Sequence, residues 1–322
     1  MRIGSLEITL HRTVRVAEGR APSNLPPSLG RMRTYNVKDY RKNCPEAWED
    51  DAVFVAIHET EALWLSLRAT EGPVALLVGA GCINAVTGEK LGTKLEKDNY
   101  LVAPPQPWLD GWKSEDGTVY QFVSTVYKGG EGNTVGEQLI GAESKTGGIG
   151  IAVFEPKDRS KMETSSYPSE KWGNDPYGGT SYYSLDSIEC CTPTMMLCCC
   201  DAPVVRSRSM KEMGVGKGGK IIQKIYPDPY GLEAWQESPS AVSAIYLVDA
   251  ETAAEITGEA VNKPVATEDY NGLWYGLDDA KKADVAGSAK FTGLKSVFAA
   301  GDTTNMPSTK DEVLRTRLSL LN

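Results

Sequence analysis

The sequence predicts a mainly β protein with a sandwich-like fold and a few short helices. Three observations predict it: short apolar runs with strand-like alternation recur along the chain, turn residues separate them, and the composition suits a protein with a buried core. Of the 322 residues, 41% are hydrophobic and 24% are charged, which is close to ordinary globular usage. Many short strands with turn signals between them are typical of a β-sandwich.

The first half of the chain reads as a series of strands. Residues 3–16 alternate between apolar and polar side chains, as a half-buried strand does. A loop follows at 24–30, because two prolines there remove amide donors and fix φ, and residues 37–48 favour a short helix that ends near Pro45. A turn is expected at 79–81, and prolines restrict 100–112 to an edge strand or a loop. Further strand-like runs lie at 53–58, 62–67, 74–78, 83–86, 118–127 and 149–154.

The second half contains a change of composition. Residues 157–208 are rich in Ser, Tyr, Gly, Asp and Pro, which indicates a long connection. Strand patterns resume at 218–227 and 241–249, and 250–256 favours a short helix or turn. We therefore expect an N-terminal β-domain at 1–156, an irregular connection at 157–208, a second β-domain at 209–300, and a C-terminal arm with a helix at 301–322.

Two pairs of segments resemble each other within the chain. GGIGIAVFEP (147–156) is similar to GGKIIQKIYP (218–227), and AVTGE (85–89) is similar to EITGE (255–259). Two related β-domains would explain both likenesses, and so would chance.

The charge balance bears on the classes of partner. The formal net charge is −9 and the pI is about 5.0, which disfavours a nucleic-acid binder, since such a protein needs a basic face for the phosphates. No stretch approaches the roughly 20 apolar residues that span a bilayer, so we expect no membrane insertion.

Five of the seven cysteines lie in the run CCTPTMMLCCC (190–200). A secreted disulfide framework would spread its cysteines more evenly, so the run favours a reducing compartment. Thiolates suit zinc or copper(I), but no second pair of ligands accompanies the run, and we predict no metal site.

Residues with catalytic potential do not form a recognisable pattern. His11 and His58 are the only histidines, and Glu61 stands where the H-E-x-x-H zinc motif needs its second histidine. GVGKGG (214–219) departs from the Walker pattern after Lys217, and a turn is predicted there. We expect no cofactor.

A carbohydrate site is the alternative that the residues leave open. Glu59 or Glu61 with Asp110 would supply the acid and base, and Trp64, Trp108 and Trp112 would stack on sugars. The structural interpretation treats these tryptophans as core or interface anchors.

Several motifs resemble a largely uncharacterised family of bacterial and fungal proteins and, more specifically, the pyrenoid shell proteins (PyShell) of diatoms. They are LHRTVRV (10–16), LPPSLG (25–30), EALWLS (61–66), NAVTGE (84–89), PWLDG (107–111), QFV (121–123), GGKIIQKIYPDP (218–229), ITG (256–258) and GLW (272–274). The likeness spans most of the chain and leaves out 156–208.

The resemblance implies a structural protein that assembles with copies of itself into sheets or tubes, as a shell around the Rubisco-rich matrix of the pyrenoid. It implies a chloroplast location for a mature form without its transit peptide; otherwise the protein would be cytoplasmic. It carries no catalytic residue, so we expect no enzyme activity. The alternatives are a carbohydrate-active enzyme and a β-sandwich module that binds carbohydrate or protein.

The C-terminal residues predict a short amphipathic helix. Thr309 and Glu312 fit a capping box. Leu314, Leu318 and Leu321 recur on one helical face, with Val313 beside them. A helix this short is marginal alone in water, so the stripe needs a surface to cover. We predict that Val313, Leu314, Leu318 and Leu321 mediate self-association; docking on the helix's own subunit is the other possibility.

Overall fold

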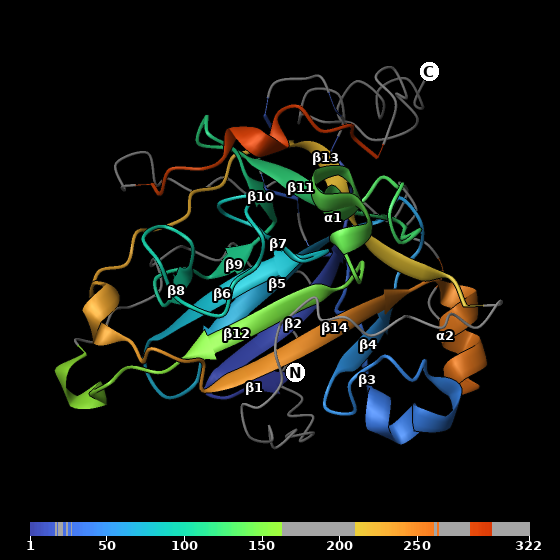
Figure 1. The fold of residues 1–322 in the computed structure, drawn as a ribbon, viewed down its shortest axis with the longest axis horizontal. Coiled ribbons are helices and arrows are strands. Elements are labelled where there is room, and N and C mark those ends of the chain that lie inside the picture. The colour runs from blue at the N-terminus through green and yellow to red at the C-terminus, as the bar shows by residue number, and fades with distance from the viewer. Residues whose placement is uncertain are drawn as a thin grey trace, which may run out of the picture.

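The computed structural model describes residues 1–16, 18, 22–23, 25–26, 28–162, 210–260, 263 and 284–297. The fourteen strands of this part belong to one large, almost wholly antiparallel sheet, which confirms the mainly β prediction (Figure 1). Their bounds are β1 (Arg2–Ile3), β2 (Leu6–Thr13), β3 (Thr34–Asn36), β4 (Val53–Ala56), β5 (Ala62–Ala69), β6 (Val74–Ala80), β7 (Ile83–Asn84), β8 (Leu101–Ala103), β9 (Trp108–Leu109), β10 (Gly111–Lys113), β11 (Val119–Val126), β12 (Ile149–Phe154), β13 (Glu212–Ile221) and β14 (Ala241–Val248).

The strand order is β1-β2-β5-β11-β13-β14-β12-β6-β7. The short strands β10, β9 and β8 pair with β11, β5 and β6, and β3 pairs with β4. In the described part, β4 alone runs parallel to its neighbour, β14. Neighbours such as β11 and β13 are far apart in sequence, so the sheet depends on long-range pairing.

The main core lies between the two halves of this sheet. Alternate residues of β2 and β5, among them Ile8 and Leu65, share one buried cluster with alternate residues of β6, β12 and β14, such as Leu76, Ile151 and Ile245. The period of two places these side chains on one face of each strand. The sheet thus folds over itself in the manner of a sandwich.

Two smaller clusters cover the outer faces. The 3-10 helix η1 (Val37–Asn43) and α2 (Ala250–Thr257) contribute residues to a cluster on the outer side of β4 and β14, where Trp48 stacks on Tyr246 with ring centroids 4.5 Å apart. The loop around the 3-10 helix η4 (Leu232–Ala234) brings Trp235 against β6 and β12. The short 3-10 helices η2 (Gly141–Glu143) and η3 (Arg159–Lys161) lie on either side of β12 in the sequence.

One helix was not expected from the sequence. α1 (Val135–Ile140) begins with a complete capping box between Thr134 and Glu137. The buried Glu137 carboxylate also accepts hydrogen bonds from the backbone N–H groups of Lys128 and Gly129, at 2.6 and 2.8 Å, and so fixes the preceding loop.

The turn predicted at 214–219 is wrong, because this stretch lies inside β13. Its glycines serve close packing instead: a Cβ at Gly216 would lie 2.4 Å from Val297 Cγ2, and one at Gly214 would lie 2.8 Å from Gly147 Cα. Likewise, residues 79 and 80 extend β6, and the reversal occurs at Gly81 and Cys82, both with positive φ.

The sheet combines strands from the two expected domains, since β13 and β14 lie between β11 and β12. The internal likenesses do not correspond in structure. Residues 147–156 contain all of β12, whereas 218–227 begin at the end of β13 and continue into a loop; residues 85–89 form a turn, whereas 255–259 end α2.

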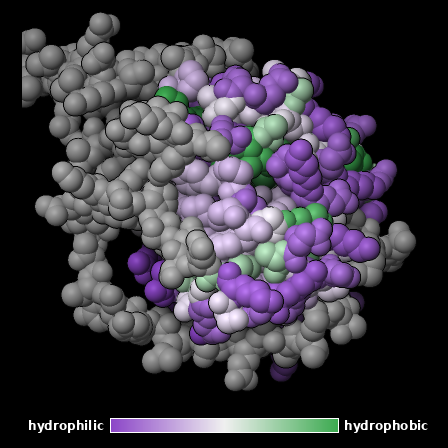
Figure 2. Space-filling model, turned by 90° about the vertical axis from the view of Figure 1, so that its left-hand side faces the viewer, coloured by the Kyte–Doolittle hydropathy of each residue, from purple (hydrophilic) through white to green (hydrophobic). Residues whose placement is uncertain are grey.

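The described surface in Figure 2 is mainly hydrophilic, with small separate hydrophobic areas. No helix among the described residues is long and apolar enough to cross a membrane.

Candidate functional site

The last described stretch of the chain, 284–297, lies against β10, β13 and α1, and we call it the strap (Figure 1, red). It contains one turn of 3-10 helix, η6 (Ala289–Phe291), whose N-cap is the Ser288 hydroxyl. We call the rest of the described chain the body. The strap makes isolated parallel bridges to the body at Ser114–Ser288 and Lys217–Ser296 rather than a continuous ladder. Side chains of the body therefore carry much of its attachment.

A fully buried lysine holds the start of the strap. Lys113 is 0% exposed, and its Nζ donates a hydrogen bond to Asp284 Oδ2 at 2.7 Å. Burial lowers the pKa of Lys113, and the bond and charge of Asp284 act in the opposite direction. The other Asp284 oxygen accepts from the N–H of Ile225 at 2.9 Å, and the N–H of Val285 donates to the Ile225 carbonyl. Because a buried ammonium is costly without a partner, Lys113 and Asp284 depend on each other.

The middle of the strap completes the main core. Phe291 and Val285 are buried in it, and the Phe291 ring lies 5.3 Å from that of Trp112. The strap and the body approach each other closely, and each has a glycine at the contact. A Cβ at Gly88 of the body would lie 3.2 Å from the Phe291 ring, and one at Gly287 of the strap would lie 2.2 Å from the Ser114 carbonyl oxygen. The strap is thus part of the hydrophobic interior as well as of the surface.

A second buried lysine holds the end of the strap. Lys217 of β13 is 4% exposed, and its Nζ donates to the carbonyls of Thr292 and Leu294 at 3.2 and 2.8 Å. The ammonium also lies 4.4 Å from the ring centre of Tyr120. The backbone carbonyl of Lys217 accepts from the N–H of Val297 at 3.0 Å.

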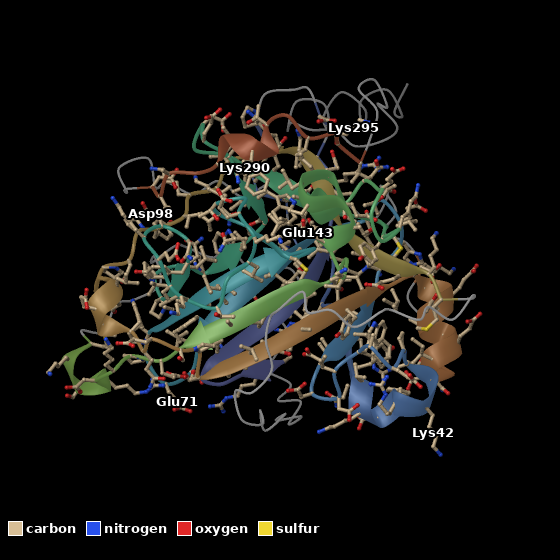
Figure 3. All side chains as sticks on the ribbon, in the orientation of Figure 1. Lys42, Glu71, Asp98, Glu143, Lys290 and Lys295 are labelled. Atoms are coloured by element: carbon tan, nitrogen blue, oxygen red, sulfur yellow. The ribbon has the colours of Figure 1, made fainter. Side chains whose placement is uncertain are left out.

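The side-chain amide of Gln138, on α1, pairs with the backbone of Lys295. Its Oε1 accepts from the Lys295 N–H at 2.7 Å, and its Nε2 donates to the Lys295 carbonyl at 2.9 Å. At the surface, Lys290 forms an ion pair with Glu89 at 2.7 Å. Figure 3 shows Lys290 and Lys295 along the strap. The point from which the chain continues beyond Val297 is therefore fixed on the body.

Sequence reasoning missed Lys113, Gln138 and Asp284. The sequence drew attention to Lys217 only because 214–219 partly resembles a phosphate-binding loop. In the structure its ammonium donates hydrogen bonds to backbone carbonyls of the strap. The residues predicted to mediate self-association, Val313, Leu314, Leu318 and Leu321, lie outside the described residues, as does the cysteine run at 190–200.

The two histidines lie in different surroundings. The His11 ring stacks on Trp64 with centroids 3.9 Å apart, and its Nδ1 and Nε2 lie 2.8 and 3.2 Å from the hydroxyls of Ser28 and Ser66. His58 lies beside Arg12 and Arg33 at a small hollow, and its backbone N–H donates to Glu61 Oε2 at 3.1 Å.

The carboxylates proposed for carbohydrate chemistry have separate partners. Glu61 is paired with Arg12, whose Nε lies 2.7 Å from Oε1, and Glu59 is paired with Lys211 on the surface. Asp110 is buried, and its carboxylate accepts from Gln223 Nε2 at 2.9 Å. The backbones of Glu61 and Asp110 meet at one edge of β11, since they accept from the N–H groups of Ser124 and Phe122.

Burial raises the pKa of Asp110 to about 8, against the opposing effect of the hydrogen bond from Gln223. Of the three tryptophans considered for stacking on sugars, Trp112 belongs to the core, whereas Trp64 and Trp108 are half-buried.

The two described cysteines differ in state. Cys44 is a buried free thiol whose pKa burial raises to about 11. Cys82 is disulfide-bonded. In the described part, no three His, Cys, Asp or Glu side chains gather as a metal site would require.

Comparisons with protein-family models, with curated proteins and with solved structures give no match for this chain.

Proposed function

We propose that this protein is a structural component that assembles with copies of itself into a layer. The observation that carries the proposal is the attachment of the strap: two buried lysines, on β10 and β13, hold its start and its end, directly before the C-terminal residues in the sequence. The sequence pattern of those residues predicts an apolar helical stripe. A terminal stripe that starts from a fixed point suits a connector between subunits, since an apolar anchor in a groove can carry much of an interface.

The contacts of the potentially catalytic residues are compatible with this role. Glu61 and Arg12 join β2 to the start of β5, and Asp110 with Gln223 joins β9 to the chain after β13. Each of these side chains links segments that are distant in sequence. By the resemblance to pyrenoid shell proteins, the layer would surround the Rubisco-rich matrix in the chloroplast.

The test uses the purified full-length chain, examined by size-exclusion chromatography with light scattering and by negative-stain electron microscopy. We expect regular sheets or tubes. Deletion from Gly301 onward, and separately Leu314→Asp with Leu318→Asp, should leave a folded protein that no longer builds sheets or tubes. Ile222→Asp with Leu232→Asp is the matched control, because both side chains are exposed outside the C-terminal stripe and their replacement also adds two charges.

A full-length chain that remains a 34.9 kDa monomer at high concentration would refute the proposal. Hydrolysis of a glycoside by the purified chain, abolished by Glu61→Gln, would favour the carbohydrate-active alternative instead.

A further inference from the structure

The seat of the strap is formed by residues of the body that precede it in the sequence. Its groups are the ammonium ions of Lys113 and Lys217, the amide of Gln138, the carboxylate of Glu89 and the ring of Trp112. The matching groups of the strap all lie between Asp284 and Val297. A strap from a second copy of the chain offers the seat the same atoms in the same order.

The length of the preceding chain allows either arrangement. Lys263 is held at the body by Arg12, whose Nη2 donates to its carbonyl at 2.7 Å. Residues 264–283 separate this point from Asp284, and a chain of that length can span about 70 Å. A compact chain of 322 residues has a radius of gyration of about 20 Å, so a strap can reach its own seat or that of a neighbour.

Resting on the proposed function, we infer that in the assembled layer the strap of each copy occupies the seat of a second copy. The exchange reuses every contact of the subunit, so it needs no new complementary surface. It buries Val285 and Phe291 in the neighbour's core. The neighbour's Lys113 and Lys217 bind the strap at its start and its end, and so fix its position along the seat. A head-to-tail exchange joins each copy to two neighbours, so it builds an open row of copies wherever the rotation does not close a ring, and the C-terminal stripes of the proposed function join such rows into the layer.

The Lys290–Glu89 ion pair offers a direct readout, because it joins strap to body and its side chains are 44% and 67% exposed. A carbodiimide converts such a pair into an amide bond that mass spectrometry identifies. Glu89→Gln and Lys290→Gln each remove one partner, at little cost to stability for so exposed a pair. When the two variants are co-expressed, the 89–290 link can form only between Lys290 of the first chain and Glu89 of the second.

We expect this link in co-assembled variants at about a quarter of the wild-type yield, since a quarter of random pairings join a competent strap to a competent seat. Neither variant alone should give it. The ion pair of Lys90 and Glu143 lies within the body and should be linked in every sample, which provides the internal control.

The experiment distinguishes a chain that assembles without exchanging straps from a chain that does not assemble. Assemblies of mixed variants without the 89–290 link, beside a wild-type assembly that shows it, would place each strap in its own subunit and overturn the exchange alone. A wild-type chain that never assembles would remove the proposed function and the exchange together.

Discussion

At the scale of single residues, burial of ionisable groups distinguishes this protein from an ordinary sandwich. Lys113, Lys217 and Asp110 are all almost completely buried, although such residues are rarely found inside proteins without partners. Each joins segments that only the folded chain brings together. Nothing in the sequence around Lys113 or Asp110 signals burial, because the acceptor or donor comes from residues more than a hundred positions away.

Asp110 should make stability depend on pH. Its pKa of about 8 in the folded protein exceeds the value near 4 of an unfolded chain, so the folded state holds an extra proton between about pH 4 and 8. The free energy of unfolding should therefore fall as the pH rises through this window. Asp110→Asn keeps an oxygen acceptor for Gln223 and removes the titration. We expect it to flatten the slope and to stabilise the protein at pH 8, in urea unfolding measured at several pH values.

Glu59→Gln provides the control, since it also removes one carboxylate but at an exposed ion pair. An Asp110→Asn variant with the slope of the wild type would show that the buried carboxyl does not titrate in this range.

At the scale of elements, alternation predicted the long strands and failed where glycine dominates. β2, β5, β12 and β14 were expected close to their observed positions, because one face of each contacts the core. The sequence predicted a turn at 214–219, which lies inside β13. Glycines that signal a turn also permit close packing of a strand, and the local sequence does not distinguish a turn from such a strand. α1 was missed although Thr134 and Glu137 form its capping box.

Gly216→Ala should destabilise the protein through the strap. The new Cβ would lie 2.4 Å from Val297 Cγ2 and 3.0 Å from the Asn133 carbonyl oxygen. Overpacking of this kind typically costs about 1–3 kcal/mol of unfolding free energy, which denaturant titration measures. Adding Val297→Ala removes the nearer atom and should recover part of the loss.

The matched control is Gly92→Ala, because no heavy atom lies within 4 Å of a Cβ at that glycine. Equal effects at Gly92 and Gly216 would contradict the packing explanation.

At the scale of the whole molecule, one sheet takes strands from both sides of the predicted domain boundary. The mainly β class was predictable from local patterns, but the strand order was not. β11 pairs with β13 through residues such as Val123 and Gly216, and no local pattern encodes a partner at that separation.

We expect the full chain to unfold in one cooperative transition, because a continuous sheet with a shared core cannot lose one half alone. Far-ultraviolet circular dichroism and tryptophan fluorescence should give coincident urea curves, since Trp112 and Trp235 report from opposite parts of the sequence. Two separated transitions would instead support independent N-terminal and C-terminal units.

The position of the strap in the sequence also affects how the protein is made. Translation delivers all fourteen described strands before Val285 and Phe291, so the nascent sheet has an open core until the strap is synthesised. During that interval, Lys113 and Lys217 have no acceptors from the strap, and exposed apolar surface favours aggregation or chaperone capture. Products terminated before Asp284 would keep this incomplete core, so the described sheet can close its core only after residues 284–297 have been made.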